Sequence, residues 1–100
     1  MKKELITPKN TTEITPETRL KRLRYRSWHR GCKETDLILG WFADENLEKM
    51  TANQLDIYEQ FLDENDVNIW DWLVGKSPIA NPDYIPIVAA LKPYGQKVNV

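Results

Sequence analysis

The stretch SWHRGCKETD, residues 27–36, separates two segments with helical periodicity and predicts the corner where one helix ends and the next begins. Gly31 occupies the place of a left-handed residue that ends a helix, since glycine adopts positive φ without a steric penalty. His29 and Arg30 precede it, where cations suit the negative end of the helix dipole. Glu34 follows in the first turn of the next pattern, where acidic groups are favoured.

The segment before this corner predicts a first helix. Thr15 has the chemistry of an N-cap residue, and Pro16 suits the first helical position because its missing N–H has no partner there. Leu20, Leu23 and Ser27 then recur at helical spacing as a narrow inward stripe, which leaves several arginines facing outward.

After the corner, the pattern predicts a second helix that begins at about Cys32 or Lys33 and runs to Met50. Its apolar residues follow the 3.6-residue period; they are Leu37, Ile38, Trp41 and Phe42. Gly40 in its middle costs up to about 1 kcal/mol relative to alanine, which suggests that another element approaches closely there.

Three further helices are predicted downstream. TANQ at 51–54 has capping-box spacing and begins a third helix with an acidic outer face. A fourth covers DVNIWDWLVG, capped by Asp66 and closed by Gly75. The last covers DYIPIVAALK, with Asp83 as N-cap and Pro93 ending it.

These elements predict an all-α fold, a small single-domain bundle of five short helices. No alternating strand pattern of useful length competes with them. We expect residues 1–15 to form a flexible N-terminal tail, residues 16–94 the five-helix domain, and residues 95–100 a C-terminal tail.

Charge is segregated along the chain, although the net charge is only -1. Seven of the fourteen basic side chains lie within residues 19–33, whereas residues 44–66 hold eight acidic residues against Lys49 alone. In one interpretation two helix faces of opposite sign attract each other within the fold. In the other, the basic segment is a surface for a nucleic acid or an acidic protein.

The single cysteine, Cys32, cannot form an internal disulfide, and with one histidine it cannot build a structural zinc site. The chain has no apolar run near the roughly 18 residues that span a bilayer, and no signal-peptide or transit-peptide pattern. We therefore expect a protein that is not inserted in a membrane, in the bacterial cytoplasm.

Catalytic patterns are weak. Cys32 and His29 form a candidate nucleophile pair, but a glycine turn between them and the absence of an obvious third group disfavour it. Glu34 and Asp36 point to different sides of a helix, which is poor geometry for acid and base catalysis on one bond. Trp70 and Trp72 cannot both face one core, so one of them is a candidate interface anchor.

Arg30, Gly31 and Glu34 fit an R-G-x-x-E pattern between a basic helix and an apolar one. This resembles the family of succinate dehydrogenase assembly factors that promote flavin attachment, the SdhE/Sdh5 family. Further similar features follow in the same order: Asp36, the stretch LILGWFADE, an acidic third helix, and DVNIWDWLVG with Trp72 and Leu73. The resemblance covers about residues 19–92.

The resemblance implies a chaperone that binds the flavoprotein subunit of succinate dehydrogenase, or of the related fumarate reductase, and assists covalent bonding of FAD to a histidine of that subunit. It implies no enzyme, no catalytic residue and no cofactor of its own, because the partner binds the FAD. Carried over residue by residue, Arg30, Gly31 and Glu34 would contact the flavoprotein, with Asp36 as a neighbour. The alternative for Arg30 and Glu34 is an intramolecular pair worth under about 1 kcal/mol if exposed.

Two other functions remain open on the residues alone. One is a small nucleic-acid-binding module that uses the basic segment 19–33, which predicts steeply salt-dependent binding. The other is an antitoxin-like regulatory module that blocks another protein through exposed tryptophans. The slightly negative net charge and the acidic third helix argue against the nucleic-acid module.

Overall fold

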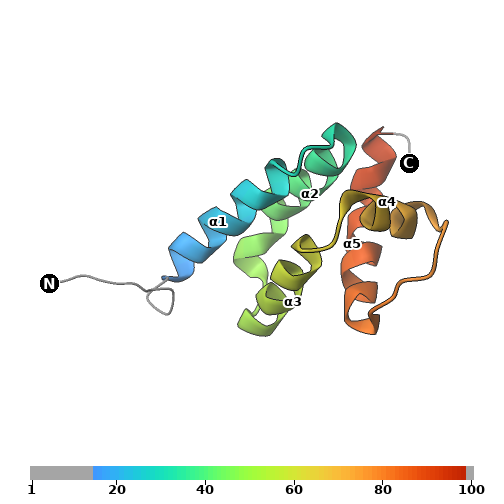
Figure 1. Ribbon diagram of the computed structural model, residues 1–100. Helices are drawn as coiled ribbons and strands as arrows, with labels where there is room; N and C mark the ends of the chain where they lie inside the picture. Colours follow the sequence, from blue (N-terminus) through green and yellow to red (C-terminus); the bar gives the residue numbers. More distant parts are fainter. Residues whose placement is uncertain (1–14, 99–100) are drawn as a thin grey trace, which may run out of the picture.

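A computed structural model describes residues 15–98, which fold into five α-helices joined by short turns (Figure 1). The helices are α1 (Pro16–Trp28), α2 (Lys33–Asn46), α3 (Ala52–Leu62), α4 (Asp66–Val74) and α5 (Ile85–Gly95). Short 3₁₀ turns follow α2 (η2, Leu47–Lys49), precede α5 (η3, Pro82–Tyr84) and follow α5 (η4, Gln96–Val98). The all-α prediction is confirmed; the predicted N-terminal tail lies outside the described residues except for Thr15.

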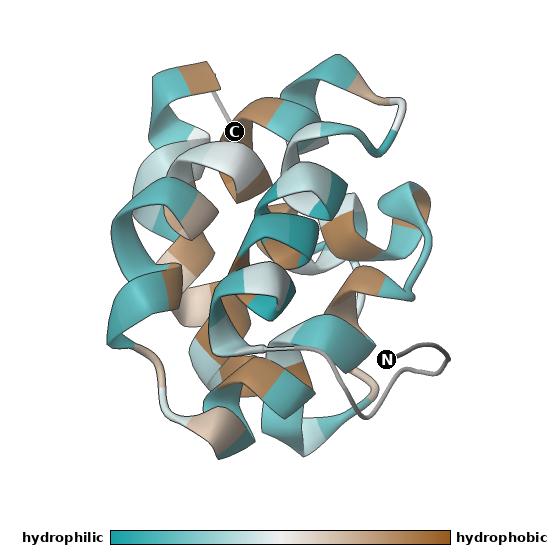
Figure 2. Ribbon diagram, turned by 90° about the vertical axis from the view of Figure 1, so that its left-hand side faces the viewer, coloured by the Kyte–Doolittle hydropathy of each residue, from teal (hydrophilic) through white to brown (hydrophobic). Residues whose placement is uncertain are grey.

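Helix α2 is the central element of the bundle. It runs back along α1 after the corner and also packs against α4 and α5, while α3 packs against α1 (Figure 1). Figure 2 shows hydrophobic residues on the sides of the helices that face one another and hydrophilic residues on the outer turns. Every helix contributes buried side chains to one core, among them Leu23, Ile38, Phe42, Tyr58, Phe61, Ile69, Trp72 and Leu91.

Two predicted helix starts are confirmed at atomic level. The Thr15 hydroxyl accepts a hydrogen bond of 3.1 Å from the backbone N–H of Thr18, and Pro16 follows as the first helical residue. At α3, Thr51 Oγ1 accepts from the Gln54 N–H at 3.1 Å, and Gln54 Oε1 accepts from the Thr51 N–H at 2.9 Å. This is the reciprocal capping box that the spacing predicts.

The second and fourth helices differ from their predicted ends. Helix α2 ends at Asn46 and the chain tightens into η2, so it does not continue to Met50. The N-cap of α4 is Asn65, whose side chain accepts from the Asn68 N–H at 2.8 Å, and not Asp66. Asp66 follows as the first helical residue, and its carboxylate binds Arg30.

The last helix is longer than predicted. Asn81, and not Asp83, caps the start through η3, and α5 passes through Pro93 to Gly95. Proline removes one hydrogen bond in the last turn, and Tyr94 offsets the loss: its ring meets Phe42 edge-on at 6.2 Å between centroids. The predicted boundary after residue 94 therefore falls inside α5, and η4 extends the ordered chain to Val98.

The predicted close approach at Gly40 is confirmed, and the approaching group is Trp28. A Cβ built on Gly40 would lie 2.1 Å from Cδ2 of the Trp28 indole, so only glycine leaves room for the ring. The Trp28 indole N–H also donates to Asp44 Oδ1 at 3.2 Å. The last residue of α1 is thereby held across the middle of α2.

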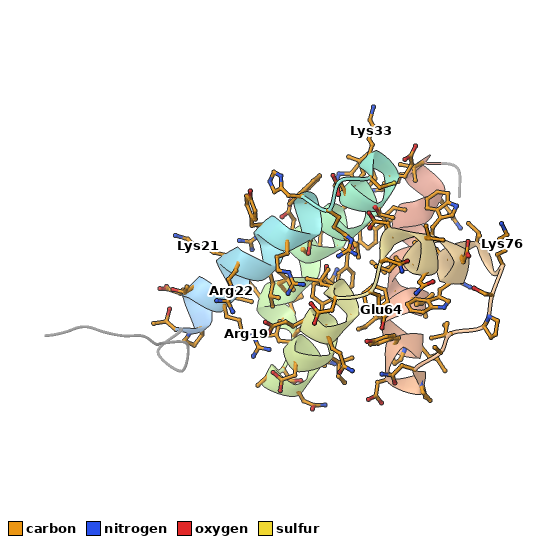
Figure 3. All side chains as sticks on the ribbon, viewed as in Figure 1. Arg19, Lys21, Arg22, Lys33, Glu64 and Lys76 are labelled. Carbon is orange, nitrogen blue, oxygen red and sulfur yellow. The ribbon has the colours of Figure 1, made fainter. Side chains whose placement is uncertain are left out.

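The segregated charges attract each other within the fold. Arg19 pairs with Asp56 at 2.6 Å and Arg26 with Asp63 at 2.7 Å, both across the α1–α3 interface. Figure 3 shows Arg19 on the side of α1 that faces α3, and Lys21 on the opposite side. Further carboxylate partners are Glu59 for Arg19 and Arg22, Asp44 and Glu48 for Arg24, and Asp66 for Arg30. The first interpretation of the charge pattern is confirmed.

A buried hydroxyl pair explains the serine in the apolar stripe of α1. Ser27 Oγ donates to the Leu23 carbonyl at 2.8 Å and lies 2.6 Å from the Tyr58 hydroxyl. Because the serine proton is committed to the carbonyl, the tyrosine donates to Ser27 Oγ. Burial raises the pKa of Tyr58 well above its ordinary value, so this hydroxyl keeps its proton.

Candidate functional site

The corner between α1 and α2 presents bare backbone to solvent. Helix α1 ends at Trp28, and its C-cap is His29. Gly31, the residue predicted to end the helix, lies two residues further along the chain. Gly31 has φ +110°, so its predicted positive φ is confirmed, and a Cβ built on it would meet no other atom within 4 Å. The space over Gly31 is open, and its conformation is one that side chains with a Cβ rarely adopt.

Asp36 holds this corner from the first turns of α2. Its Oδ1 accepts hydrogen bonds from the backbone N–H groups of Arg30, at 2.7 Å, and Gly31, at 3.3 Å. The carboxylate thus satisfies donors that the turn would otherwise leave to water. Contact of Asp36 with a partner stays a prediction, and its carboxylate is directed to the protein's own backbone.

Arg30 reaches away from the corner to the junction of α3 and α4. Its Nε donates to Asp66 Oδ1 at 2.6 Å and its Nη1 to the Leu62 carbonyl at 2.7 Å, while Nη2 donates to the Glu64 carbonyl. The side chain is only 10 % exposed. We call this set of contacts the Arg30 clasp.

The clasp changes the interpretation of the motif arginine. An intramolecular pair with Glu34 was one expectation, but the guanidinium binds Asp66 and two carbonyls instead. A guanidinium offers donors in a rigid fork, and here they join the end of α1 to the end of α3 and the start of α4. Direct contact of Arg30 with a partner stays a prediction, and its side chain faces inward.

Glu34 is exposed on the first turn of α2, with its Oε1 3.6 Å from the Cys32 thiol. Across from it, one face of α4 completes a hollow of about 260 Å³. We call this the corner hollow; its lining residues are Cys32, Glu34, Asp66, Val67, Trp70 and Asp71. It places the motif glutamate at the edge of an apolar depression.

The α4 side of this hollow was not predicted from the sequence. Val67 is 68 % exposed although it is a large apolar residue, because the inward face of α4 is formed by Ile69, Trp72 and Leu73. Trp72 is 6 % exposed and Trp70 is half-buried, which confirms that the two tryptophans do not share one environment. The signal in the sequence that could have indicated this surface is Val67, an apolar residue outside the predicted inward face, one helical turn before Trp70.

The candidate catalytic groups have separate surroundings. The His29 ring stacks on Tyr25 at 4.1 Å between centroids, while the Cys32 thiol lies beside Glu34. Within residues 15–98 no group of three or more histidine, cysteine or acidic side chains is arranged to hold a metal ion. None of the helices in that part of the chain is long and apolar enough to cross a membrane.

Comparison with known families gives a match that covers the corner between α1 and α2. A sequence model of the family described as flavinator of succinate dehydrogenase, Sdh5, matches residues 21–94. The chain belongs to the Sdh5 family. The matched region includes the Arg30 clasp, the corner hollow and all of helices α2 to α4.

Named relatives of this Sdh5-family chain come from several organisms. The FAD assembly factor SdhE of Acetobacter pasteurianus is 37% identical over 70 residues, which cover 70% of this chain and 64% of the relative. Succinate dehydrogenase assembly factor 2, mitochondrial, of Meyerozyma guilliermondii is 45% identical over 67% of this chain and 50% of the relative. The protein of the same name from Penicillium rubens is 49% identical over 61% of this chain and 20% of the relative. The chain therefore spans less than two thirds of the length of these relatives.

These relatives overturn one expectation. A bacterial cytoplasmic location was predicted from the absence of targeting signals and from the single cysteine. The relatives from Meyerozyma guilliermondii, Penicillium rubens and Dictyostelium discoideum are mitochondrial by name. The prediction of a bacterial cytoplasmic protein is wrong, because several relatives that match this chain are mitochondrial proteins by name.

Proposed function

We propose that this chain binds the flavoprotein subunit of succinate dehydrogenase and promotes covalent attachment of FAD to it. The observation that carries the proposal is the corner itself, where exposed Gly31 lies beside exposed Glu34 on a turn held from within. The description of the Sdh5 family and the name FAD assembly factor of one relative support the proposal.

The geometry suits recognition of another protein's backbone. With open space over Gly31, a partner strand or loop approaches the main chain of the turn without meeting a side chain. The neighbouring Glu34 carboxylate is available for a charge-assisted hydrogen bond to the partner. Because the turn is already ordered, binding requires little further loss of conformational entropy.

The three motif residues and the neighbouring Asp36 divide into two roles in this proposal. Gly31 and Glu34 are the contact residues, since both are exposed. Arg30 and Asp36 are positioning residues, since their polar atoms bind the protein's own backbone and Asp66. This short segment therefore contains both the residues that contact the partner and the residues that hold them in position.

The proposed role is that of a chaperone, with no catalytic residue in this chain. The flavoprotein binds the FAD, and the covalent bond forms between the flavin and a histidine of that subunit. The factor holds the immature subunit in a conformation in which the histidine reaches the flavin. The flavoprotein subunit of fumarate reductase is the second client that this mechanism allows.

The test is co-expression with each flavoprotein subunit in a host that lacks such a factor, followed by denaturing electrophoresis and measurement of flavin fluorescence retained by the subunit. We expect the wild-type chain to increase the signal, and Glu34→Ala or Gly31→Arg to remove the gain while the protein stays folded. Glu48→Ala is the matched control, because Glu48 is an exposed acidic residue outside the corner. No gain with folded wild-type protein and a receptive subunit would refute the proposal.

A further inference from the structure

The corner hollow extends the contact edge from α2 onto α4. Cys32 and Glu34 belong to the motif turn, whereas Val67, Trp70 and Asp71 line the opposite wall. Val67 is 68 % exposed, and Trp70 packs against the core but stays half-buried, so α4 leaves apolar surface accessible to a partner. A surface of this kind beside a proposed interface is a candidate for inclusion in it.

The size of the hollow indicates what enters it. A volume of about 260 Å³ is below the roughly 300–1,000 Å³ typical of small-molecule and cofactor pockets. The hollow is also open to solvent, and its lining residue Cys32 directly follows Gly31 in the chain, so its occupant can arrive with a partner backbone that crosses Gly31. A single long side chain of the partner fits these conditions better than a free cofactor.

The charge of the hollow indicates the chemistry of that side chain. Its lining contains three carboxylates, those of Glu34, Asp66 and Asp71, and no basic residue. Asp66 is neutralised by the Arg30 clasp, which leaves Glu34 and Asp71 on opposite walls. Figure 3 shows that the nearby Lys33 projects outward from the start of α2, away from the body of the protein.

We propose that the corner hollow receives an arginine or lysine side chain of the flavoprotein partner. Its aliphatic stem packs on Val67 and Trp70, and its cationic group lies between the carboxylates of Glu34 and Asp71. Basic side chains bury their stems on apolar surface in this way, and an indole face adds a cation–π contribution. This inference rests on the proposed function and makes α4 part of the binding site.

The test measures the affinity of the full chain for the purified flavoprotein subunit by isothermal titration calorimetry. Asp71→Asn keeps the shape and removes the charge, and Val67→Ser removes the apolar contact at an exposed position. We expect each to weaken binding about tenfold, which corresponds to about 1.4 kcal/mol. Asp71→Glu should retain most of the affinity, and Asp71→Asn should also reduce the salt dependence of binding.

Two control variants, one on α4 and one on η3, separate a local effect from general destabilisation. Val74→Ser alters an exposed valine of α4 outside the hollow, and Asp83→Asn removes an exposed charge of η3. Both should bind as the wild type does. Circular dichroism and thermal unfolding of every variant establish that the fold is unchanged.

The possible outcomes distinguish this inference from the proposed function. If Glu34→Ala abolishes binding while Asp71→Asn and Val67→Ser bind like the wild type, the hollow is not occupied and the inference is overturned. If Val67→Ser weakens binding but Asp71→Asn does not, the occupant is apolar and the basic side chain is refuted. If the wild-type chain itself does not bind the subunit, the proposed function fails.

Discussion

Arg30 Nε and Asp66 Oδ1 lie 2.6 Å apart and join the end of α1 to the start of α4, two elements separated by the whole of α2 and α3. The same guanidinium binds the carbonyls of Leu62 and Glu64 at the end of α3. One side chain therefore determines how the motif turn and the α3–α4 junction lie relative to each other.

Arg30→Ala is expected to lower the free energy of unfolding by about 2–4 kcal/mol, because it leaves a half-buried carboxylate and two carbonyls without their donor. Arg30→Lys should recover little of this loss, since an ammonium group cannot reach three acceptors in a fork. Urea denaturation of the variants measures both effects. Arg22→Ala is the control: Arg22 is 47% exposed and 3.8 Å from Glu59, and its loss should cost under about 1 kcal/mol. Equal effects for the two arginines would contradict the clasp.

Gly31 and Gly75 form a natural matched pair. Both have positive φ, +110° and +77°, and a Cβ on either would meet no atom within 4 Å. Alanine at Gly75 should therefore cost about 1–2 kcal/mol through backbone strain alone, and alanine at Gly31, whose φ lies beyond the left-handed α region, should cost at least as much. Only Gly31→Ala should weaken binding to the flavoprotein subunit, because only Gly31 lies on the proposed contact edge. Equal binding by both variants, compared after correction for the folded fraction, would remove Gly31 from the interface.

Gly40→Ala tests the contact with Trp28. At an exposed position inside a helix, alanine is more stabilising than glycine by up to about 1 kcal/mol. At position 40, however, the alanine methyl group would overlap the indole ring of Trp28. We expect a net destabilisation of about 1–3 kcal/mol, typical of overpacking, and a change in tryptophan fluorescence as the ring moves. A stabilised variant with unchanged fluorescence would show that the ring is not held against α2.

Alkaline pH should destabilise the fold. Burial raises the pKa of Tyr58 and Tyr84, and the hydrogen bond to Glu45 raises that of Tyr94. The pKa values of these tyrosines are higher in the folded state than the unfolded value of about 10. Their protonated hydroxyls therefore contribute fully to the free energy of unfolding below pH 10, and this contribution is lost as the pH rises beyond it. Urea denaturation between about pH 8 and pH 12 should show the decline. Tyr58→Phe should make the decline shallower, and an unchanged slope would contradict the contribution of the buried hydroxyl.

The local features of the fold were predictable from the sequence. Thr15, the Thr51–Gln54 box and the positive φ of Gly31 and Gly75 each depend on a few neighbouring residues, and all of them agree with the structure. The close approach at Gly40 was also predicted, although the approaching residue was not. Short-range chemistry thus determines where most of these helices begin and turn.

What depends on distant residues was not predictable. The partners of Arg30 lie more than thirty residues further along the chain, so its inward direction follows only from the packing of α3 and α4. Asn65 caps α4, while Asp66 is the first helical residue and binds Arg30. In the corner hollow, Val67 and Asp71 face Glu34 only because α4 packs beside α2. Pro93 is tolerated in α5 through the tertiary contacts of Tyr94.

The Arg30 clasp also sets an order of events during synthesis of the chain. A nascent polypeptide that has emerged only as far as the third helix carries Gly31 and Glu34 but lacks Asp66, the carboxylate that anchors the guanidinium. Asp36 can already hold the backbone of the motif turn at that stage, but the Arg30 side chain gains its carboxylate partner only after the fourth helix has left the ribosome and docked. The recognition surface is therefore complete only late in translation, and premature chains that end before residue 66 would display the motif without the carboxylate that anchors Arg30.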